Sequence, residues 1–167
     1  MIIKVWTDGG TRGNGTENAL GAWGYWGVYD FNLAKMNFEG GGVVESTTNQ
    51  RMELTAALEA LKRTKILNIE APVFLYTDSA YLYNCWKQRW YSKWMSNGWI
   101  NSKEEPVSNK DLWEQLIPFF QLGFLTLKKV KGHSGNAGNE KADKIVNKQM
   151  DMFLEKQKEK VDEDSCN

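Results

Sequence analysis

The sequence predicts an α/β protein in which five strands form one mixed sheet with helices packed on its faces. Two observations lead to this prediction. The hydrophobic pattern gives the element order βββαβα(αα)βα, in which strands alternate with helices after the third strand. The length of 167 residues, of which 41% are hydrophobic, suits one domain with one sizeable core.

The first part of the sheet is predicted to be an antiparallel meander. Residues 2–8 form the first strand, which ends at Gly9-Gly10, and residues 20–29 and 35–44 form the next two strands. Aromatic and β-branched residues, interrupted by Gly, mark these segments. Their short connections favour pairing between neighbours in the sequence.

The second part alternates helices with strands. From Thr48 the apolar residues recur at helical spacing, as at Leu54 and Leu58, with Thr48 or Asn49 as the N-cap. Residues 73–78 are almost continuously apolar, which is typical of a strand buried on both faces. The remaining predicted elements are a helix from Ser79, a Trp-rich stretch broken at Gly98, a helix at 109–121, a strand at 124–130 and a helix at 138–154.

One domain and a short tail account for the chain. Residues 1–154 are predicted to form the folded domain. Residues 155–167 carry five acids and three lysines and are predicted to be a charged, disordered C-terminal tail. A segment that binds a partner is the alternative for this tail.

Composition and motifs exclude several classes of protein. No apolar run approaches the ~20 residues of a membrane helix, and the N-terminus does not resemble a signal peptide, so a cytoplasmic location is expected, with a nuclear one as the alternative. Cys85 and Cys166 lie far apart and His133 is the only histidine, which argues against a disulfide framework and a Cys/His zinc site. The chain has no nucleophile elbow of a serine hydrolase and no phosphate-binding NTPase loop.

The charge pattern gives a limited indication of a nucleic-acid partner. Basic and acidic residues balance at 21 each, which by itself argues against such a partner. Residues 86–103, however, contain Lys87, Arg89, Lys93 and Lys103 and no acid. A local basic patch is therefore predicted on a nearly neutral protein.

Four acidic residues occupy positions that call for an explanation. Asp8 and Asp78 each follow an apolar strand, at the edge where α/β sheets commonly bind ligands. Glu53 and Asp143 lie in the first and last predicted helices, next to residues that face the sheet. If the first and fourth strands are parallel neighbours, Asp8 and Asp78 lie side by side, and the two helices can bring Glu53 and Asp143 to them.

Such a cluster of carboxylates would need a cation, because the charges repel and raise each other's pKa values. Hard oxygen ligands favour Mg²⁺ or Mn²⁺, and two such ions about 4 Å apart can activate a water and stabilise the leaving oxygen in phosphodiester cleavage.

Each acid taken singly also has a simpler explanation. Asp8 or Asp78 could be a turn former or a helix cap, and Glu53 or Asp143 could lie on a solvated helix face.

Five short motifs, in their order and spacing, resemble a type 1 ribonuclease H. They are T-D-G-G at 7–10, T-N-Q-R-M-E-L at 48–54, Y-T-D-S at 76–79, K-G-H-S-G at 131–135 and G-N-E-K-A-D at 138–143. The similarity covers about residues 2–150. It implies a ribonuclease H-like fold, with three antiparallel strands and then two parallel ones, and an endonuclease that hydrolyses the RNA strand of RNA–DNA hybrids. Residues 1–154 would be its catalytic domain.

The resemblance implies roles for the catalytic residues. Asp8, Glu53, Asp78 and Asp143 match the carboxylates that hold two Mg²⁺ ions, with Mn²⁺ as a substitute, and the expected products carry a 5′-phosphate and a 3′-hydroxyl. Asp8 would contact both ions, Asp143 would help to hold the ion with the attacking water, and the other two acids would hold the second ion. His133 matches a loop histidine that assists proton handling or release of product and metal.

The resemblance also implies contacts with the hybrid. The backbone near Gly9 and Gly10 would approach the RNA closely. The second predicted strand lacks the arginine that some members of the family use to bind phosphate. The side chains implied in hybrid binding are Asn14, Asn49 and Gln50 in the minor groove, and Thr48 and Asn109 at a DNA phosphate.

The stretch from Trp86 to Trp99 resembles the basic protrusion that lies against the DNA strand. Trp86, Trp90 and Trp94 recur every four residues as a helical stripe. Packing of the rings on the body of the protein is the alternative role, and Trp90 or Trp94 is expected to stack on a deoxyribose. With four cations in the patch, hybrid affinity is expected to be modest and salt-sensitive.

The expected partner is an RNA–DNA hybrid, with no membrane and no obligatory protein partner, and the protein is expected to be a monomer. Two other functions compete with this one. Another nuclease or a transposase of the same fold would keep the acids but should lack the Asn and Gln residues and the Trp-rich protrusion. A non-catalytic hybrid-binding module should have lost at least one of the four acids, and all four are present.

Overall fold

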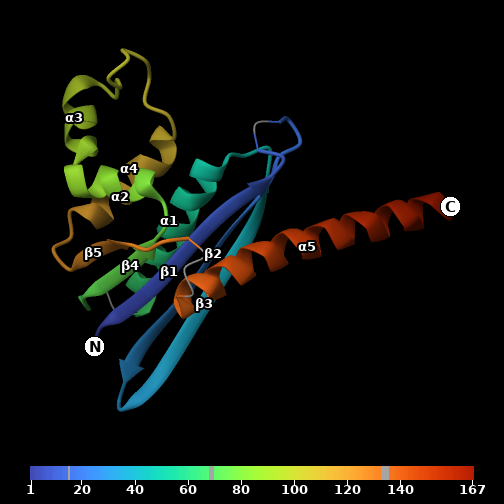
Figure 1. Cartoon of the computed structure of the whole chain (residues 1–167), viewed down its shortest axis with the longest axis horizontal. Coiled ribbons are helices and arrows are strands. Elements are labelled where there is room, and N and C mark those ends of the chain that lie inside the picture. The colour runs from blue at the N-terminus through green and yellow to red at the C-terminus, as the bar shows by residue number, and fades with distance from the viewer. Residues whose placement is uncertain (15, 68–69, 133–135) are drawn as a thin grey trace.

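The computed structural model describes residues 1–14, 16–67, 70–132 and 136–167, which form one sheet with helices on both of its faces (Figure 1). The strands are β1 (Ile3–Arg12), β2 (Leu20–Phe31), β3 (Ala34–Glu45), β4 (Val73–Thr77) and β5 (Leu125–Lys129). The helices in this part of the chain are α1 (Asn49–Leu67), α2 (Ala80–Gln88), α3 (Trp90–Asn97), α4 (Lys110–Phe120) and α5 (Ala137–Ser165).

The sheet is mixed and has the strand order β3-β2-β1-β4-β5. β1, β2 and β3 pair antiparallel as the predicted meander. β4 pairs parallel with β1, and β5 pairs parallel with β4, because helices carry the chain back between these strands. The predicted α/β fold with a five-stranded mixed sheet is therefore confirmed.

β1 differs from its prediction in length. The predicted end at Gly9-Gly10 is wrong, because the strand continues to Arg12 and both glycines pair with β2. Gly9 serves another purpose: a Cβ atom there would lie 2.3 Å from the backbone carbonyl carbon of Met52 in α1. The glycine therefore marks a close approach of helix to strand, not a turn.

α1 and α5 pack on opposite faces of the sheet. Successive residues of a strand point to opposite faces, and Gly9 lies against Met52 of α1 whereas Gly10 lies near Val146 of α5. The larger core fills the α1 face and includes Trp113 of α4, which is fully buried. The smaller cluster beneath α5 consists of Leu20, Ala22, Val146 and Met150.

Side-chain caps fix where the helices α1, α2 and α5 begin. The predicted cap Thr48 accepts a hydrogen bond from the Arg51 N–H at 3.2 Å. Ser79 caps α2 by accepting from the Leu82 N–H at 3.1 Å, and Asn136 caps α5. Because an N-cap satisfies backbone donors that the helix itself leaves unpaired, each cap defines the first turn of its helix.

The Trp-rich stretch does not form one helix. Arg89 adopts the left-handed conformation (φ 54°), which ends α2 and precedes α3. Trp86 therefore lies on α2, whereas Trp90 and Trp94 lie on α3. The predicted continuous stripe of three rings is wrong, although the ring centroids of Trp90 and Trp94 are 6.3 Å apart.

α5 is longer than predicted and projects away from the sheet (Figure 1). Ala142, Val146 and Met150 are buried as expected, but Leu154 is 46% exposed. Where the sequence predicted a disordered end, residues 155–165 continue the helix with exposed side chains. Their Glu, Lys and Gln residues are good helix formers, which favours a helix without a buried face. Within the described ranges, each helix is either too short or too polar to span a membrane.

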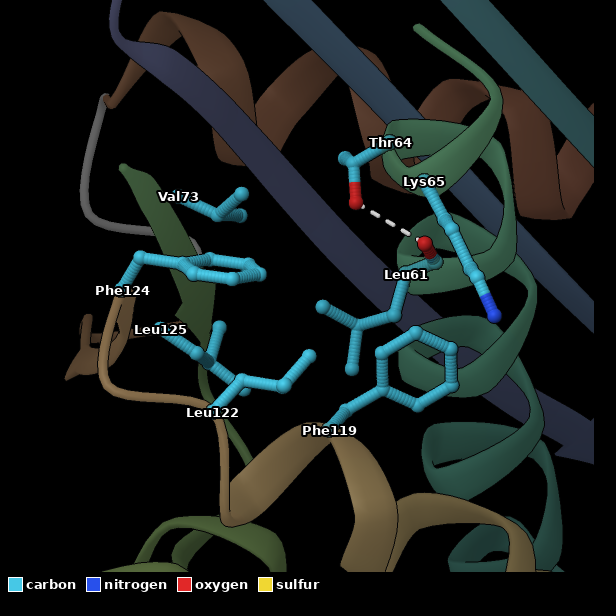
Figure 2. Close-up of a pocket in the computed structure, with 8 residues that line it drawn as sticks. All are labelled: Leu61, Thr64, Lys65, Val73, Phe119, Leu122, Phe124 and Leu125. Carbon is cyan, nitrogen blue, oxygen red and sulfur yellow. Dashed lines mark hydrogen bonds between the residues drawn. The ribbon is translucent and has the colours of Figure 1, made fainter. Parts of the chain in front are cut away.

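An apolar hollow lies at the edge of the larger core, between α1, α4 and the strands β4 and β5 (Figure 2). It holds about 10 Å³ of space, which is room for roughly one water molecule. The Thr64 hydroxyl on its wall already donates a hydrogen bond to the Leu61 carbonyl at 2.8 Å. This hollow is therefore a gap in the packing of the core.

Candidate active site

The sheet places Asp8 and Asp78 beside each other. β1 and β4 are parallel neighbours, and their pairing runs from Ile3↔Val73 to Trp6↔Tyr76. Two residues further along, Asp8 and Asp78 lie level at the same edge of the sheet. The predicted juxtaposition of these two acids is confirmed.

The two helices on opposite faces bring the other acids to this edge. Glu53 lies in the second turn of α1, which can approach β1 closely because Gly9 has no side chain. Asp143 lies on α5 beside the buried Ala142. All four carboxylates line a single cavity of about 310 Å³, whose lining in the described part of the chain is Asp8, Gly9, Gly10, Thr11, Arg12, Asn49, Glu53, Asp78, Asn139, Asp143, Val146, Asn147 and Met150.

The pKa of Asp8 is strongly raised in this cavity. Burial, followed by the charges of Asp78 and Asp143, raises its pKa to about 8. The Gly9 N–H donates a hydrogen bond to Asp8 Oδ1 at 2.9 Å, which favours the charged form but does not offset the burial. The side chains of Asp8 and Asp143 also share a hydrogen bond that favours the protonated form.

Glu53 is held by the helix cap of α2. Burial raises its pKa, and the nearby Asp78 adds to this effect. The Ser79 hydroxyl donates a hydrogen bond to the Glu53 carboxylate, which lowers the pKa again. Since Ser79 is buried and also caps α2, one residue orients both the helix and the carboxylate.

This donor set fits divalent cations. Carboxylate oxygens that repel one another in a partly buried cavity are ligands that Mg²⁺ and Mn²⁺ prefer. Among the described residues, no three Asp, Glu, His or Cys side chains gather around one point closely enough to enclose a single ion. The acids are spread along the cavity, with Asp8 close enough to interact with both Asp78 and Asp143.

A group of amide side chains lies beside the carboxylates. Asn49 lines the same cavity, and its Oδ1 accepts a hydrogen bond from the Thr11 hydroxyl at 2.7 Å. The Asn49 N–H donates to Asn14 Oδ1 at 3.4 Å, so Asn14 also belongs to this group. Gln50 follows in the first turn of α1 and is exposed. The predicted minor-groove residues therefore lie on one surface beside the cavity.

A second group contains a residue that the sequence analysis missed. Thr48 and Asn109, both predicted to bind a DNA phosphate, are joined by Arg51. The backbone N–H of Arg51 donates to the Thr48 hydroxyl, and the side-chain Nη1 of Arg51 donates to Asn109 Oδ1 at 3.2 Å. Arg51 also forms an ion pair with Asp111 at 2.7 Å, which lowers the pKa of that acid. Arg51 was visible inside the T-N-Q-R-M-E-L motif, but only the fold reveals its contact with Asn109.

The third predicted group is the aromatic surface of α3. Trp90 and Trp94 line a hollow of about 400 Å³ together with Arg89 and Lys93. Trp94 also packs on the buried Trp113, with ring centroids 5.6 Å apart. Each ring is therefore partly packed on the body of the protein and partly accessible beside cations, and stacking on a deoxyribose stays a prediction.

Other predictions fall outside the cavity or outside the described residues. His133 lies in the segment 133–135, outside the part of the chain that the structure describes. Four further polar residues line the carboxylate cavity without having been predicted as site residues from the sequence: Thr11, Arg12, Asn139 and Asn147. Asn139 stands in the G-N-E-K-A-D motif, whereas nothing in the local sequence marks Arg12.

Comparison with known proteins gives a consistent result. The family model described as RNase H matches residues 2–151. A protein named Ribonuclease H from Clostridium botulinum is 39% identical over 151 residues, which are 90% of this chain and 97% of that protein. A Ribonuclease H from Syntrophomonas wolfei is 42% identical over 144 residues, covering 86% of this chain and 92% of the relative.

Solved structures resemble the fold. LC9-RNase H1, described as a type 1 RNase H with the type 2 active-site motif, superposes with a TM-score of 0.76 at 24% identity, covering 88% of this chain and 71% of that one. LC11-RNase H1, solved in complex with an RNA/DNA hybrid, gives a TM-score of 0.64 at 21% identity, covering 91% and 99%. At these identities the likeness concerns the fold alone.

Proposed function

This chain belongs to the ribonuclease H family and is a nuclease for the RNA strand of RNA–DNA hybrids, and we propose that it hydrolyses this strand with two divalent ions held by Asp8, Glu53, Asp78 and Asp143. The observation that carries the proposal is the convergence of these carboxylates, from two neighbouring strands and two helices, on one cavity. The ions are Mg²⁺, with Mn²⁺ as a substitute, because both are hard cations that bind carboxylates and phosphates.

The roles of the acids follow their positions. Asp8 lies close to both Asp78 and Asp143 and is assigned to both ions. Asp143 is assigned to the ion nearer the attacking water, and Glu53 and Asp78 to the other. When bound, the ions supply Lewis acidity to the attacking water and to the leaving 3′-oxygen, giving 5′-phosphate and 3′-hydroxyl products.

The protein groups around the acids keep their oxygens in place. The Gly9 N–H holds one oxygen of Asp8, and the Ser79 hydroxyl holds the carboxylate of Glu53. Hydrogen bonds of this kind to ligand carboxylates fix their orientation and tune their basicity. His133, outside the described residues, is assigned to proton handling or to release of product and metal.

Recognition of the hybrid is assigned to three surfaces. Asn14, Asn49 and Gln50 would read the minor groove, because amides both donate and accept hydrogen bonds to base edges and 2′-hydroxyls. The backbone at Gly9 and Gly10 would lie near the RNA. Further contacts to the DNA strand are assigned to Thr48, Arg51 and Asn109 at a phosphate and to Trp90 and Trp94 at a deoxyribose.

A cleavage assay with three labelled substrates of one sequence tests the proposal. The purified chain is expected to cut the RNA of an RNA–DNA hybrid in Mg²⁺ or Mn²⁺, to be inactive in EDTA, and to leave duplex RNA and duplex DNA largely intact. Cleavage of duplex DNA would favour another nuclease or a transposase of this fold. Binding of the hybrid without cleavage in either metal would favour a non-catalytic module and overturn the proposal.

A further inference from the structure

Arg12 stands apart from the other residues of the carboxylate cavity. Among the described residues that line this cavity, Arg12 is the only cation. Its Nη1 lies 2.8 Å from Asp151 Oδ1 of α5, and its side chain is 41% exposed. A positive charge at the rim of an acidic cavity needs an explanation, since its ion pair lies away from the four acids.

The path from the acids to Arg12 is defined by a strand and a helix that run side by side. In β1, Asp8, Gly10 and Arg12 point to the same face, because side chains alternate along a strand. Gly10 has Val146 of α5 as its neighbour, and Arg12 has Asp151. The cavity therefore extends along the seam between β1 and α5, away from the carboxylates.

The length of this seam is that of a short stretch of nucleic acid. Four residues of strand from Asp8 to Arg12 span about 13 Å, and eight residues of helix from Asp143 to Asp151 span about 12 Å. Asn147 lies midway and also lines the cavity. Successive phosphates of one strand are six bonds apart, nearly twice the 3.4 Å axial rise per nucleotide, so a phosphate about two or three nucleotides from the cut would lie beside Arg12.

The ion pair of Arg12 is easily exchanged. Both partners are exposed, with 41% and 62% of their side-chain surface accessible, and pairs of this kind contribute little to stability. A guanidinium binds a phosphate through two parallel hydrogen bonds, which are charge-assisted. Asp151 therefore holds the guanidinium at the rim without binding it strongly.

We propose that Arg12 binds a phosphate of the RNA strand about two or three nucleotides from the scissile bond, and that Asp151 holds Arg12 in place until the substrate arrives. The inference deepens the proposed function and rests on it. The RNA strand is the one concerned because its scissile phosphate must enter the carboxylates, and the seam continues from them. Arg12 is a binding residue here and takes no part in the chemical step.

Steady-state kinetics on a hybrid with one dominant cleavage site test this role. Arg12→Gln is expected to raise KM about tenfold, the value of one charge-assisted contact, and to leave kcat within about twofold. Arg12→Lys should recover part of the loss, because a lysine keeps the charge but not the paired hydrogen bonds. Lys62→Gln is the matched control, since it removes the cation of another exposed ion pair, with Glu59, outside the cavity.

Asp151→Asn separates binding from stability. If Arg12 binds a phosphate of the substrate, the Asp151→Asn variant has a KM no higher than that of the wild type. Without the Asp151 carboxylate, no charged partner competes with the phosphate for Arg12. If the pair only fastens β1 to α5, Arg12→Gln and Asp151→Asn lower Tm equally and change KM in the same direction, which overturns the inference. Wild-type cleavage of the hybrid is measured alongside, and its absence would count against the proposed function instead.

Uncharged substitutes for single phosphates of the RNA strand show which phosphate Arg12 contacts. A single 2′-deoxy methylphosphonate nucleotide is placed at successive positions of the RNA strand, with the 2′-deoxy phosphate nucleotide as the control. One position about two or three nucleotides from the cut should raise KM for the wild type and have no further effect on Arg12→Gln, as a double-mutant cycle requires for two groups in contact. Additive losses at every position would overturn the assignment.

Discussion

Asp8 shows how the site depends on a cation. Its pKa is raised to about 8 because burial and the charges of Asp78 and Asp143 oppose ionisation. Between its ordinary pKa of 3.8 and about 8, the folded metal-free protein keeps a proton that the unfolded chain has lost. The free energy of unfolding therefore falls as the pH rises through this window, and the full loss is present above about pH 8. A bound divalent cation would reverse the effect by favouring the charged carboxylate.

Metal binding should be linked to this proton. Near pH 6.5, Mg²⁺ binding is expected to release about one proton, and the apparent affinity should rise with pH and level off above about pH 8. Calorimetric titrations in buffers of different ionisation enthalpy measure the proton release directly. An affinity that does not change between pH 5.5 and 8 would show that Asp8 is already ionised in the free protein.

Removing the charge of Asp8 should separate chemistry from folding. Asp8→Asn is expected to reduce cleavage at least about 100-fold, because a metal ligand is lost, while hybrid affinity stays within about threefold. At pH 8 the metal-free variant should unfold at a Tm that is ~2–4 °C or more higher than that of the wild type. Asp30→Asn, at the exposed end of β2, is the matched control and should change neither quantity. Turnover at the wild-type rate would remove Asp8 from the metal site.

β1 and α1 position the acids through one close contact. The backbone of α1 occupies the space in which a Gly9 side chain would lie, so Glu53 reaches the cavity that Asp8 and Asp78 line. Gly10, on the opposite face, is less constrained: the nearest atom to a Cβ there would be Val146 Cγ1 at 3.9 Å. The two adjacent glycines thus have different tasks.

Substituting these glycines tests the contact. Gly9→Ala is expected to lower the free energy of unfolding by about 1–3 kcal/mol or more, the usual range for overpacking, and to reduce cleavage because Glu53 is displaced. Gly10→Ala is the matched control and should stay within about 1 kcal/mol of the wild type. The variants are compared by urea unfolding and by kcat on the hybrid. Equal effects at both positions would contradict a specific role of Gly9.

The sequence predicted most elements and the four acids, and its errors have physical causes. Alternating and helical periodicities depend on burial, so the order of strands and helices and the juxtaposition of Asp8 with Asp78 were accessible from the sequence. The left-handed Arg89, which divides the Trp stripe, adopts a conformation that is uncommon for residues other than glycine, so nothing in the local sequence predicts it. Arg12 and Arg51 could not be assigned partners, because their contacts are 139 and 58 residues away in the sequence.

Across the molecule, the candidate functional groups lie within residues 1–154, whereas the end of α5, residues 155–165, projects away from the sheet. The carboxylate cavity, the Thr48–Arg51–Asn109 group and the hollow of Trp90 and Trp94 come from elements that pack on the sheet or on one another. The family match ends at residue 151. Residues 155–165 have only exposed side chains. We therefore infer that residues 1–154 form the catalytic unit.

Shortening α5 tests this division. A chain ending at Leu154 is expected to keep its Tm within about 2 °C and its kcat and KM within about twofold, since it loses only exposed side chains. A chain ending at Gln149 is the control: it lacks Met150, which is 3% exposed and packs with Leu20 and Ala22, and should unfold at a clearly lower temperature. Loss of activity in the first truncation would show that the end of α5 takes part in function.

The most direct test of the central claim is a crystal of this chain soaked with Mn²⁺ and measured by anomalous scattering. Two peaks are expected inside the cavity, both within coordination distance of Asp8, with Asp143 bound to one ion and Glu53 and Asp78 to the other. Peaks at unrelated acids, or a cavity without manganese at millimolar concentration, would contradict the account.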